Sequence, residues 1–331
     1  MLAMQFRKPQ DVEKEPLKKS DVSIPEPSKG QVRIKINFCG VCHTDLHIVE
    51  GDITPSKIPL IPGHQVVGRL DKVGIGVTDQ NIGDRVGVPW LYDACGICEF
   101  CESGQENLCA EARFTGFNVD GGFCEYMVAE SKYVLPLPKY LPDEQAAPLL
   151  CAGIIGYRSL NQADVSQGKR IGLFGFGASA HLTIQVANYW DCEVYVFTRS
   201  QEHRKHALDL GAAWVGGADD PPPKLLDSAI IFAPVGWMVP KVLEKLRPGG
   251  TLAINAIHMT PIPEIPYELI YEERTMRSVA NATRQDGIEF LKLAEKIPIV
   301  STVNIFALED ANEALIKIKN SSINGEAVLE V

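Results

Sequence analysis

The start of the sequence lacks the pattern of a secretory signal, because residues 1–7 (MLAMQFR) begin no basic segment that leads into an apolar core and a small-residue cleavage site. The chain also lacks any uninterrupted apolar run approaching the roughly 20 residues that span a bilayer. We therefore expect a cytoplasmic protein with no membrane partner. In that reducing compartment, the nine cysteines are better explained as metal ligands, catalytic groups or buried small side chains than as a disulfide framework.

Basic side chains are also scarce. The 32 lysines and arginines are outnumbered by 42 aspartates and glutamates, which gives a formal net charge of −10. This balance argues against nucleic acid or an anionic membrane as the main partner and favours a small-molecule substrate. At 331 residues the chain exceeds the length at which a single core usually keeps growing, so two domains are expected.

The two halves of the chain differ in their residue patterns. Up to about residue 150, short β-like runs are broken by glycine and proline, and residues 31–36 (QVRIKI) alternate like a half-buried strand. From about residue 152, apolar strands alternate with helical stretches, which indicates βαβ units and a parallel sheet. We predict strands at residues 170–174, 193–198, 228–232 and 251–256. For the tail we predict helices at residues 287–296 and 311–319 and a strand at 327–331.

Four cysteines are crowded into one segment with the spacing C-x2-C-x2-C-x7-C. They are Cys95, Cys98, Cys101 and Cys109. Four thiolates suit a closed tetrahedral zinc site, because soft sulfur ligands match Zn²⁺ and fill all four positions. The alternative is a loop of unrelated cysteines, but free cysteines are seldom this dense in an intracellular chain. The segment therefore predicts a structural zinc site.

A dispersed set of residues offers a second kind of zinc site. Two thiolates and one imidazole leave the fourth position open, as a zinc ion that acts as a Lewis acid on a substrate requires. Candidate ligands are Cys42, His64 and Cys151. The residues alone leave the choice open, because packed cysteines and core histidines are common. Other cysteines available to such a site are Cys39, Cys124 and Cys192.

A glycine-rich turn at residues 175–180 (GFGASA) follows the predicted strand 170–174 and has the form G-x-G-x-x-A. Gly175 allows the tight turn, Gly177 lets the backbone approach a pyrophosphate, and Ala180 permits close helix packing. Apolar residues three and four positions apart after Ala180 predict a helix, whose N-terminus would face the phosphates. The strand-turn-helix context predicts dinucleotide binding.

The end of the next predicted strand indicates which dinucleotide is bound. Residues 194–201 (VYVFTRSQ) contain no carboxylate, whereas NAD enzymes usually place Asp or Glu there on the adenosine ribose. Thr198, Arg199 and Ser200 stand there instead, and hydroxyls with an arginine can bind a 2′-phosphate. NADP is therefore favoured, and the alternative is an exposed turn arginine with NAD as the cofactor.

Taken in order, these motifs resemble the zinc-dependent alcohol dehydrogenases of the medium-chain dehydrogenase/reductase family, over essentially the whole chain. The matching features are residues 42–47 (CHTDLH), Gly63 with His64, the four-cysteine segment, residues 121–123 (GGF), Cys151 and the glycine-rich turn. The resemblance implies two zinc ions per chain. Cys42, His64 and Cys151 would bind the catalytic ion, and the four-cysteine segment the structural ion.

The resemblance also implies an α/β fold in two domains. Residues 1–151 with 280–331 would form a GroES-like, β-rich catalytic domain that binds both zinc ions. Residues 152–279 would form a Rossmann domain with a doubly wound parallel sheet. Such an enzyme interconverts alcohols and aldehydes or ketones by moving a hydride to or from NAD(P). A homodimer or homotetramer is expected, as in the family.

Further roles follow from the same resemblance. Thr44 takes the position of a hydroxyl that binds the substrate oxygen, and a hydroxyl can donate and accept at once. The family then passes the proton through a ribose hydroxyl of the cofactor to a surface histidine, whose place His47 occupies. Asp45 matches the carboxylate that holds the imidazole of His64. Side chains at positions that line the substrate cleft are Ile53, Trp90, Leu91 and, as a weaker match, Ile257.

Two positions depart from the family pattern. Gln65 follows the histidine ligand where the family usually has Glu, which removes a negative charge beside the zinc site. Glu326 stands in the final G-x-x-V-L segment where the family usually has Arg, a customary partner of the pyrophosphate. Arg284 is a candidate to meet the phosphate charge instead.

Two other functions compete with this interpretation. Zinc polyol and threonine dehydrogenases share the plan, but they commonly use Glu where Cys151 stands. A catalytically silent relative that only binds the cofactor is the second alternative, because one fold hosts many functions. The intact ligand set, together with Thr44 and His47, argues against silence.

Overall fold

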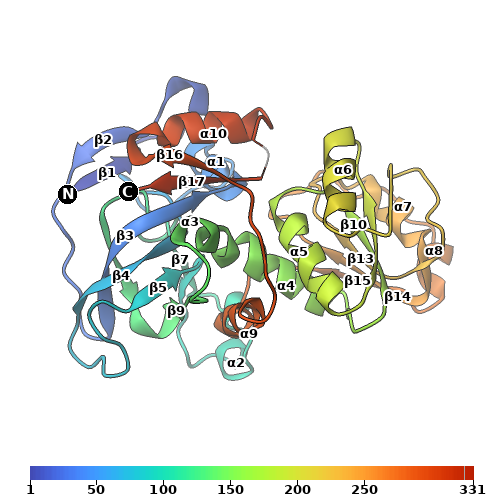
Figure 1. Ribbon diagram of the computed structural model, residues 1–331, viewed down its shortest axis with the longest axis horizontal. Coiled ribbons are helices and arrows are strands. Elements are labelled where there is room, and N and C mark those ends of the chain that lie inside the picture. The colour runs from blue at the N-terminus through green and yellow to red at the C-terminus, as the bar shows by residue number, and fades with distance from the viewer. Residues whose placement is uncertain (324) are drawn as a thin grey trace. The chain divides into compact units, whose positions relative to one another are not determined.

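The computed structural model describes residues 1–323 and 325–331, which form two compact units (Figure 1). The first unit holds Met1–Cys151, Asn281–Lys296 and Val300–Val331. The second unit holds Ala152–Ala280 and Ile297–Ile299. The chain therefore leaves the first unit after Cys151 and returns to it for its C-terminal tail.

A seven-stranded sheet, counted over the described residues, forms the centre of the first unit. Its strands follow the order β16-β17-β3-β4-β5-β9, and β8 also pairs with β3. The bounds are β3 (Gln31–Val41), β4 (Gln65–Val73), β5 (Arg85–Val88), β8 (Tyr126–Glu130), β9 (Leu135–Pro136), β16 (Val303–Ala307) and β17 (Glu326–Glu330). In β3, Val32, Ile34 and Ile36 are buried and the residues between them are not, which confirms the predicted alternation.

Two further strand pairs and several short helices surround this sheet. The strand pairs, both antiparallel, are β1 (Leu2–Gln5) with β2 (Lys18–Asp21) and β6 (Leu91–Asp93) with β7 (Arg113–Phe114). The helices are α1 (His43–Glu50), α2 (Glu99–Glu102), α3 (Asp143–Ala146), α9 (Arg284–Ala294) and α10 (Ala311–Lys319), with 3₁₀ turns at Val12–Lys14, Glu106–Leu108, Ser131–Tyr133, Ala147–Leu150 and Leu308–Asp310. The four-cysteine segment is therefore the loop between β6 and β7.

The C-terminal tail completes the sheet of the first unit. Strand β17 pairs antiparallel with β3 and parallel with β16, with Ala327 opposite Val41. Helix α10 has the predicted bounds, whereas α9 begins three residues before the predicted start at Gly287. The reason is a capping box: the Thr283 hydroxyl accepts the N–H of Asp286, and the Asp286 carboxylate accepts the N–H of Thr283.

The second unit is built on a six-stranded sheet, all parallel, in the order β12-β11-β10-β13-β14-β15. Its strands are β10 (Arg170–Phe174), β11 (Glu193–Phe197), β12 (Trp214–Gly216), β13 (Leu226–Ile231), β14 (Leu246–Ile254) and β15 (Thr275–Ser278). The four predicted strands are present. Strand β14 begins earlier than predicted, because Leu246 already pairs with Leu226 before a bulge leads to Thr251 opposite Ser228. The edge strands β12 and β15 were not predicted.

The helices of the second unit are α4 (Ala152–Gln162), α5 (Ala178–Tyr189), α6 (Gln201–Asp209), α7 (Met238–Leu243) and α8 (Glu268–Tyr271). Helix α5 is the one predicted after the glycine-rich turn. Its apolar side chains, including Ile184 and Val186, are fully buried. Helix α4 packs closely against it at Gly156, where a Cβ atom would lie 2.4 Å from the Thr183 hydroxyl oxygen.

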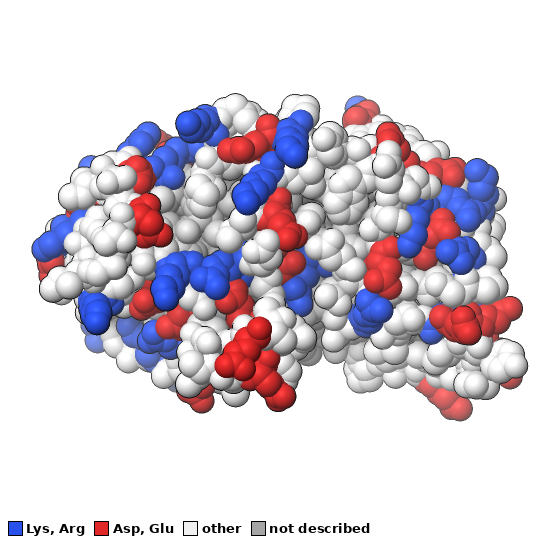
Figure 2. Space-filling view, turned by 90° about the horizontal axis from the view of Figure 1, so that it is seen from below, with Lys and Arg blue, Asp and Glu red and all other residues white. Residues whose placement is uncertain are grey.

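Charged side chains of both signs are interspersed on the face of the molecule shown in Figure 2. The net charge of −10 is therefore not gathered into a single acidic patch on that face. Within the described part of the chain, the helices are too short or too polar to cross a membrane.

Candidate metal centres and cofactor site

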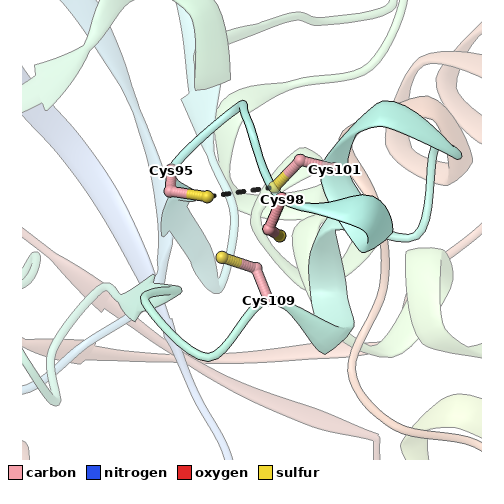
Figure 3. Close-up of side chains that lie close together, drawn as sticks. All are labelled: Cys95, Cys98, Cys101 and Cys109. Carbon is pink, nitrogen blue, oxygen red and sulfur yellow. Dashed lines mark hydrogen bonds between the residues drawn. The ribbon is translucent and has the colours of Figure 1, made fainter.

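The thiols of the four-cysteine segment converge on one point in the loop between β6 and β7 (Figure 3). The Sγ atoms of Cys95, Cys98, Cys101 and Cys109 all lie within 4.8 Å of one another, and those of Cys95 and Cys101 are 3.9 Å apart. A disulfide would bring two sulfur atoms to about 2.05 Å. Four thiolates at the usual Zn–S distance of about 2.3 Å stand roughly 3.8 Å apart in a tetrahedron. The segment therefore fits a closed zinc site.

Short local structures hold these thiols in place. Cys98 caps the start of α2, which carries Cys101, and Cys109 follows the 3₁₀ turn Glu106–Leu108. The backbone N–H groups of Ile97 and Cys98 donate to the sulfur of Cys95 and lower the pKa of that thiol to about 7. The backbone thus favours the thiolate form, which is the form that binds metals.

A second donor set lies where β3 ends and β4 begins. Cys42 follows β3 and caps α1, His64 precedes β4, and Cys151 follows the 3₁₀ turn Ala147–Leu150. Their donor atoms lie within 4.8 Å of one another, with Cys42 Sγ 3.4 Å from His64 Nε2. A hydrogen bond from the Cys151 thiol, and the Thr44 N–H at 3.3 Å, help lower the pKa of Cys42 well below its ordinary value. Three converging donors leave a fourth position for a substrate.

The other three cysteines named as alternatives lie elsewhere. The Cys39 thiol donates to the Gly40 carbonyl at 3.6 Å, and the Cys124 thiol to the Tyr126 carbonyl at 3.1 Å. Burial raises the pKa values of both thiols, that of Cys124 to about 12. Cys192 belongs to the second unit. The structure thus brings together Cys42, His64 and Cys151 and leaves the other three as packed thiols.

Asp45 fixes the orientation of the His64 ring. Its Oδ1 atom is 3.1 Å from His64 Nδ1 and 3.0 Å from the Gly63 N–H, and its Oδ2 atom accepts the Cys42 N–H at 3.0 Å. Although burial opposes the charged ring, Asp45 and Cys42 raise the pKa of His64 to about 10. With Nδ1 bound to a carboxylate, Nε2 is the nitrogen that faces Cys42 and is available to a metal.

Helix α1 carries the two residues expected to move a proton. Thr44 is in its first turn, close to the candidate ligand Cys42, and His47 is one turn further along. His47 Nδ1 lies 2.7 Å from Asp52 Oδ2, a contact that the sequence analysis did not anticipate. Because the carboxylate accepts from Nδ1, the Nε2 atom of His47 remains available for proton exchange.

Trp90 forms an aromatic wall beside His64. The two rings meet edge to face with centroids 4.9 Å apart, and Phe114 stacks on Trp90 with centroids 5.1 Å apart. The indole N–H donates to Asn281 Oδ1 at 3.0 Å, so the tail of the chain helps to orient this ring. Phe114 and Asn281 were not recognised in the sequence, because nothing in their local pattern marks them.

The other residues matched to the substrate cleft are placed differently. Leu91 is buried at the start of β6, and Ile53 packs on the core of the first unit. Ile257 belongs to the second unit and is 56% exposed. Trp90 is in contact with a candidate ligand, the imidazole of His64.

The two departures from the family pattern lie on the two strands that flank β3, Gln65 on β4 and Glu326 on β17. Gln65 pairs with Gly40, and a Cβ atom at Gly40 would approach the Gln65 side chain to within 3.0 Å, so its amide lies across β3. On the other side of β3, the pairing of Ala327 with Val41 puts Glu326 next to Cys42 in register. Burial, reinforced by the Cys42 thiolate, raises the pKa of Glu326 to about 8. Position 65 thus carries no carboxyl group, whereas a buried carboxyl group lies close to Cys42 on β17.

Arg284, the candidate for meeting the phosphate charge, is engaged elsewhere. Its guanidinium lies 3.5 Å from the Glu106 carboxylate and 5.0 Å from the centre of the Tyr133 ring, and its backbone N–H donates to Glu106. Arg284 therefore ties α9 to the 3₁₀ turn Glu106–Leu108, which Cys109 follows.

The glycine-rich turn in the second unit leaves space for a ligand. Gly175 has φ +91°, which favours glycine, and Ala180 is fully buried against its neighbours. A Cβ atom at Gly177 would meet nothing within 4 Å, so the backbone is open there. Gly177 caps α5 without any side-chain hydrogen bond, which leaves the first N–H groups of this helix for an anion. These features fit a pyrophosphate.

The loop after β11 contains the residues expected at the adenosine ribose. Arg199 is exposed, Thr198 is buried, and the Ser200 hydroxyl caps α6 by accepting the His203 N–H at 3.2 Å. Arg204 Nε donates to the Thr198 carbonyl at 2.9 Å. A second guanidinium, that of Arg204 on α6, was not recognised in the sequence and is hydrogen-bonded to this loop.

Known proteins resemble this chain over nearly its whole length. Residues 28–139 match the alcohol dehydrogenase GroES-like domain family, and residues 180–296 match the zinc-binding dehydrogenase family. The probable alcohol dehydrogenase AdhA of Mycobacterium tuberculosis (strain CDC 1551 / Oshkosh) is 43% identical over 335 residues, which cover 99% of this chain and 97% of that protein. Among solved structures, a cinnamyl alcohol dehydrogenase of Sorghum bicolor has a TM-score of 0.90 at 28% identity, covering 99% and 97% of the two chains. The CAD of Helicobacter pylori has a TM-score of 0.88 at 26% identity, covering 100% and 99%.

The chain therefore belongs to the alcohol dehydrogenases of the medium-chain dehydrogenase/reductase family. The expected fold class is confirmed, with a GroES-like domain in the first unit and a Rossmann-type parallel sheet in the second. Its activity is alcohol/aldehyde oxidoreduction, on a small-molecule substrate.

Proposed function

We propose that this alcohol dehydrogenase depends on zinc and binds two ions per chain with separate roles. The observation that carries the proposal is the contrast between the two donor sets. Four thiols surround one point in the β6–β7 loop, which suits a structural ion, whereas Cys42, His64 and Cys151 supply three donors and an open position. A zinc ion at the open set would supply Lewis acidity toward the substrate oxygen.

The residues around the open set would have two tasks. Some orient the candidate ligand His64, and others would carry away the proton of the alcohol. Asp45 holds His64 with Nε2 turned toward Cys42, and Trp90 closes one side of the ring. The Thr44 hydroxyl, beside Cys42, would take the proton that the alcohol loses on oxidation. His47, oriented by Asp52, would exchange it with solvent.

Metal analysis and a hydride-transfer assay test the proposal together. The chain, purified without chelators and supplied with zinc, is expected to hold two tightly bound zinc ions and to oxidise alcohols. Removal of zinc from the open set should abolish turnover, and readdition should restore it. One tightly bound ion would show that one donor set is wrongly assigned, and two ions without hydride transfer would favour a silent cofactor-binding protein.

Asp45→Asn is expected to weaken zinc binding at the open set and to lower kcat/KM by about 10- to 100-fold, the usual cost of losing the partner of a metal-bound imidazole. The amide keeps the size of the side chain but removes the charge that holds His64 Nδ1. Zinc in the four-cysteine segment is the internal control and should be retained. Equal loss of both ions would instead indicate that the first unit unfolds.

We also propose that the enzyme prefers NADP over NAD. No carboxylate in the loop after β11 repels a 2′-phosphate, Arg199 is exposed there, and Arg204 is held by the Thr198 carbonyl. The Helicobacter pylori CAD, which has the same fold, was solved with NADP(H). These observations support a ribose site built for an additional negative charge.

Arg199→Ala is expected to weaken the use of NADPH and leave that of NADH nearly unchanged. A charge-assisted hydrogen bond contributes roughly 1.5 to 3 kcal/mol, which corresponds to about a 10- to 150-fold loss at 1.4 kcal/mol per decade. Steady-state kcat/KM for both cofactors is the measurement, with the exposed Lys205→Ala on α6 as the matched control. The NADPH preference should also shrink as salt is raised. If the wild type prefers NADH, or if the variant loses kcat/KM equally with both cofactors, Arg199 is a turn residue with no role in cofactor choice.

A further inference from the structure

Three histidines meet beside the glycine-rich turn of the second unit, and the proposed function uses none of them. His181 lies on α5, and His203 and His206 lie on α6. The ring centroid of His181 is 4.5 Å from that of His206 and 6.1 Å from that of His203. Phe176, in the turn itself, packs on His181 at 4.6 Å.

The His181 ring is buried with one nitrogen unused. The side chain is 8% exposed, and its Nε2 atom has no hydrogen-bond partner among the described residues. The Phe176 carbonyl accepts a hydrogen bond from the ring, which therefore comes from Nδ1. Burial, with the two neighbouring histidines, lowers the pKa of His181 to about 3. The ring thus stays neutral, and its Nε2 atom keeps a lone pair that no described residue uses.

This is the arrangement that metal-binding histidines adopt, because they almost always donate the second ring nitrogen to a carbonyl or carboxylate. A buried polar atom without a partner is also uncommon enough to need an explanation. His203 and His206 are three residues apart on α6, so their side chains share one helix face. Both residues are only half-buried.

We propose that His181, His203 and His206 bind a divalent first-row transition-metal ion through three imidazole nitrogens, with solvent completing the coordination. Imidazole ligands suit Zn²⁺, Ni²⁺ and Cu²⁺. Binding requires the two α6 rings to turn toward His181 Nε2, because the three rings do not gather their donor atoms as closely as the two cysteine-containing sets do. The bound ion would tie α6, and the Ser200 cap at its start, to the turn that contains Phe176.

Nickel is a suitable probe, since the two zinc-binding sets can be filled with zinc beforehand. The full chain, loaded with zinc and freed of excess metal, is titrated with NiCl₂ by equilibrium dialysis and metal analysis. One saturable nickel ion per chain is expected while both zinc ions are retained. X-ray absorption at the nickel edge should show imidazole nitrogen and no sulfur.

Single variants locate the ion. His203→Asn and His206→Asn are each expected to weaken nickel binding by at least about 10-fold. Loss of a residue that only hydrogen-bonds to a metal ligand already lowers metal affinity by about 10- to 100-fold, and loss of a ligand should cost no less. His258→Asn is the matched control, because His258 is exposed in the same unit but outside the cluster, and it should bind nickel like the wild type. Both α6 positions are half-buried surface sites, and circular dichroism verifies that the variants fold.

Three results would overturn the proposal. The first is that the chain takes up no nickel in a saturable way. The second is sulfur in the nickel coordination shell, which would show that nickel displaces zinc from a cysteine site. The third is equal nickel uptake by the wild type and both α6 variants. In each case the three rings would be an aromatic packing cluster. None of these results depends on whether the enzyme is active, so they are separate from the tests of the zinc roles.

Discussion

Cys151→Ser is expected to abolish alcohol oxidation and to remove one of two zinc ions while leaving the fold intact. The open set has three protein donors, so the loss of one thiolate leaves two. Loss of a residue that only hydrogen-bonds to a metal ligand lowers metal affinity or activity by about 10- to 100-fold. Loss of a ligand itself should therefore lower kcat/KM by more than about 100-fold. Leu149 and Leu150, which precede Cys151, are buried and do not depend on the metal for their packing.

Cys98→Ser is the matched control, because it removes one thiolate from the other set. The part of the β6–β7 loop that carries Cys98 and Cys101 has little packing of its own: α2 has no buried residue and Ile97 is 81% exposed. Zinc is therefore expected to hold this loop, and the variant should lose thermal stability before it loses turnover per folded chain. Metal content, thermal unfolding and kcat/KM of both variants are the measurements. Retention of both zinc ions and of activity in Cys151→Ser would contradict the assignment, as would loss of activity at unchanged stability in Cys98→Ser.

The parts of the fold that the sequence predicted are those with a strong local pattern. Strands β10 and β11 are apolar runs next to a glycine-rich turn, and β3 alternates along residues 31–36. Strands β12 and β15 were not predicted, because β12 has only three residues and β15 lies at the sheet edge with mostly exposed side chains. Whether such a segment forms a strand depends on the neighbouring strand with which it pairs, and the local sequence pattern does not reveal this.

The candidate site residues also differ in whether a local sequence pattern marks them. The four-cysteine segment was predicted from spacing alone, because its ligands are close in sequence. Cys42, His64 and Cys151 required a family resemblance, since only the tertiary fold separates them from Cys39 or Cys124. Partners such as Asp52 and Asn281 could not be predicted, because a lone carboxylate or amide carries no pattern until the chain brings it to His47 or Trp90.

Glu326→Gln is expected to stabilise the protein at alkaline pH and to have little effect near pH 5. Glu326 is buried on β17, and burial together with the Cys42 thiolate raises its pKa from an ordinary 4.5 to about 8. A carboxyl group is costly to ionise in such surroundings. Glutamine has the same shape and stays neutral at every pH, so it removes that cost. At about 1.4 kcal/mol per pKa unit, the shift sets an upper bound of roughly 5 kcal/mol on the gain.

The sign of the pH dependence follows from which state binds the proton. Between about pH 4.5 and 8, folded Glu326 keeps a proton that the unfolded chain has released, so wild-type stability falls as the pH rises through this window and levels off above it. The difference in unfolding midpoint between Glu326→Gln and wild type, both freed of zinc so that no ion offsets the Cys42 thiolate, should therefore grow from about pH 5 to pH 9. Glu330→Gln, at an exposed position of the same strand, is the control and should show no such growth. A constant difference across this range, or one that grows toward low pH, would mean that Glu326 is not a costly buried acid and that a partner stabilises its charge.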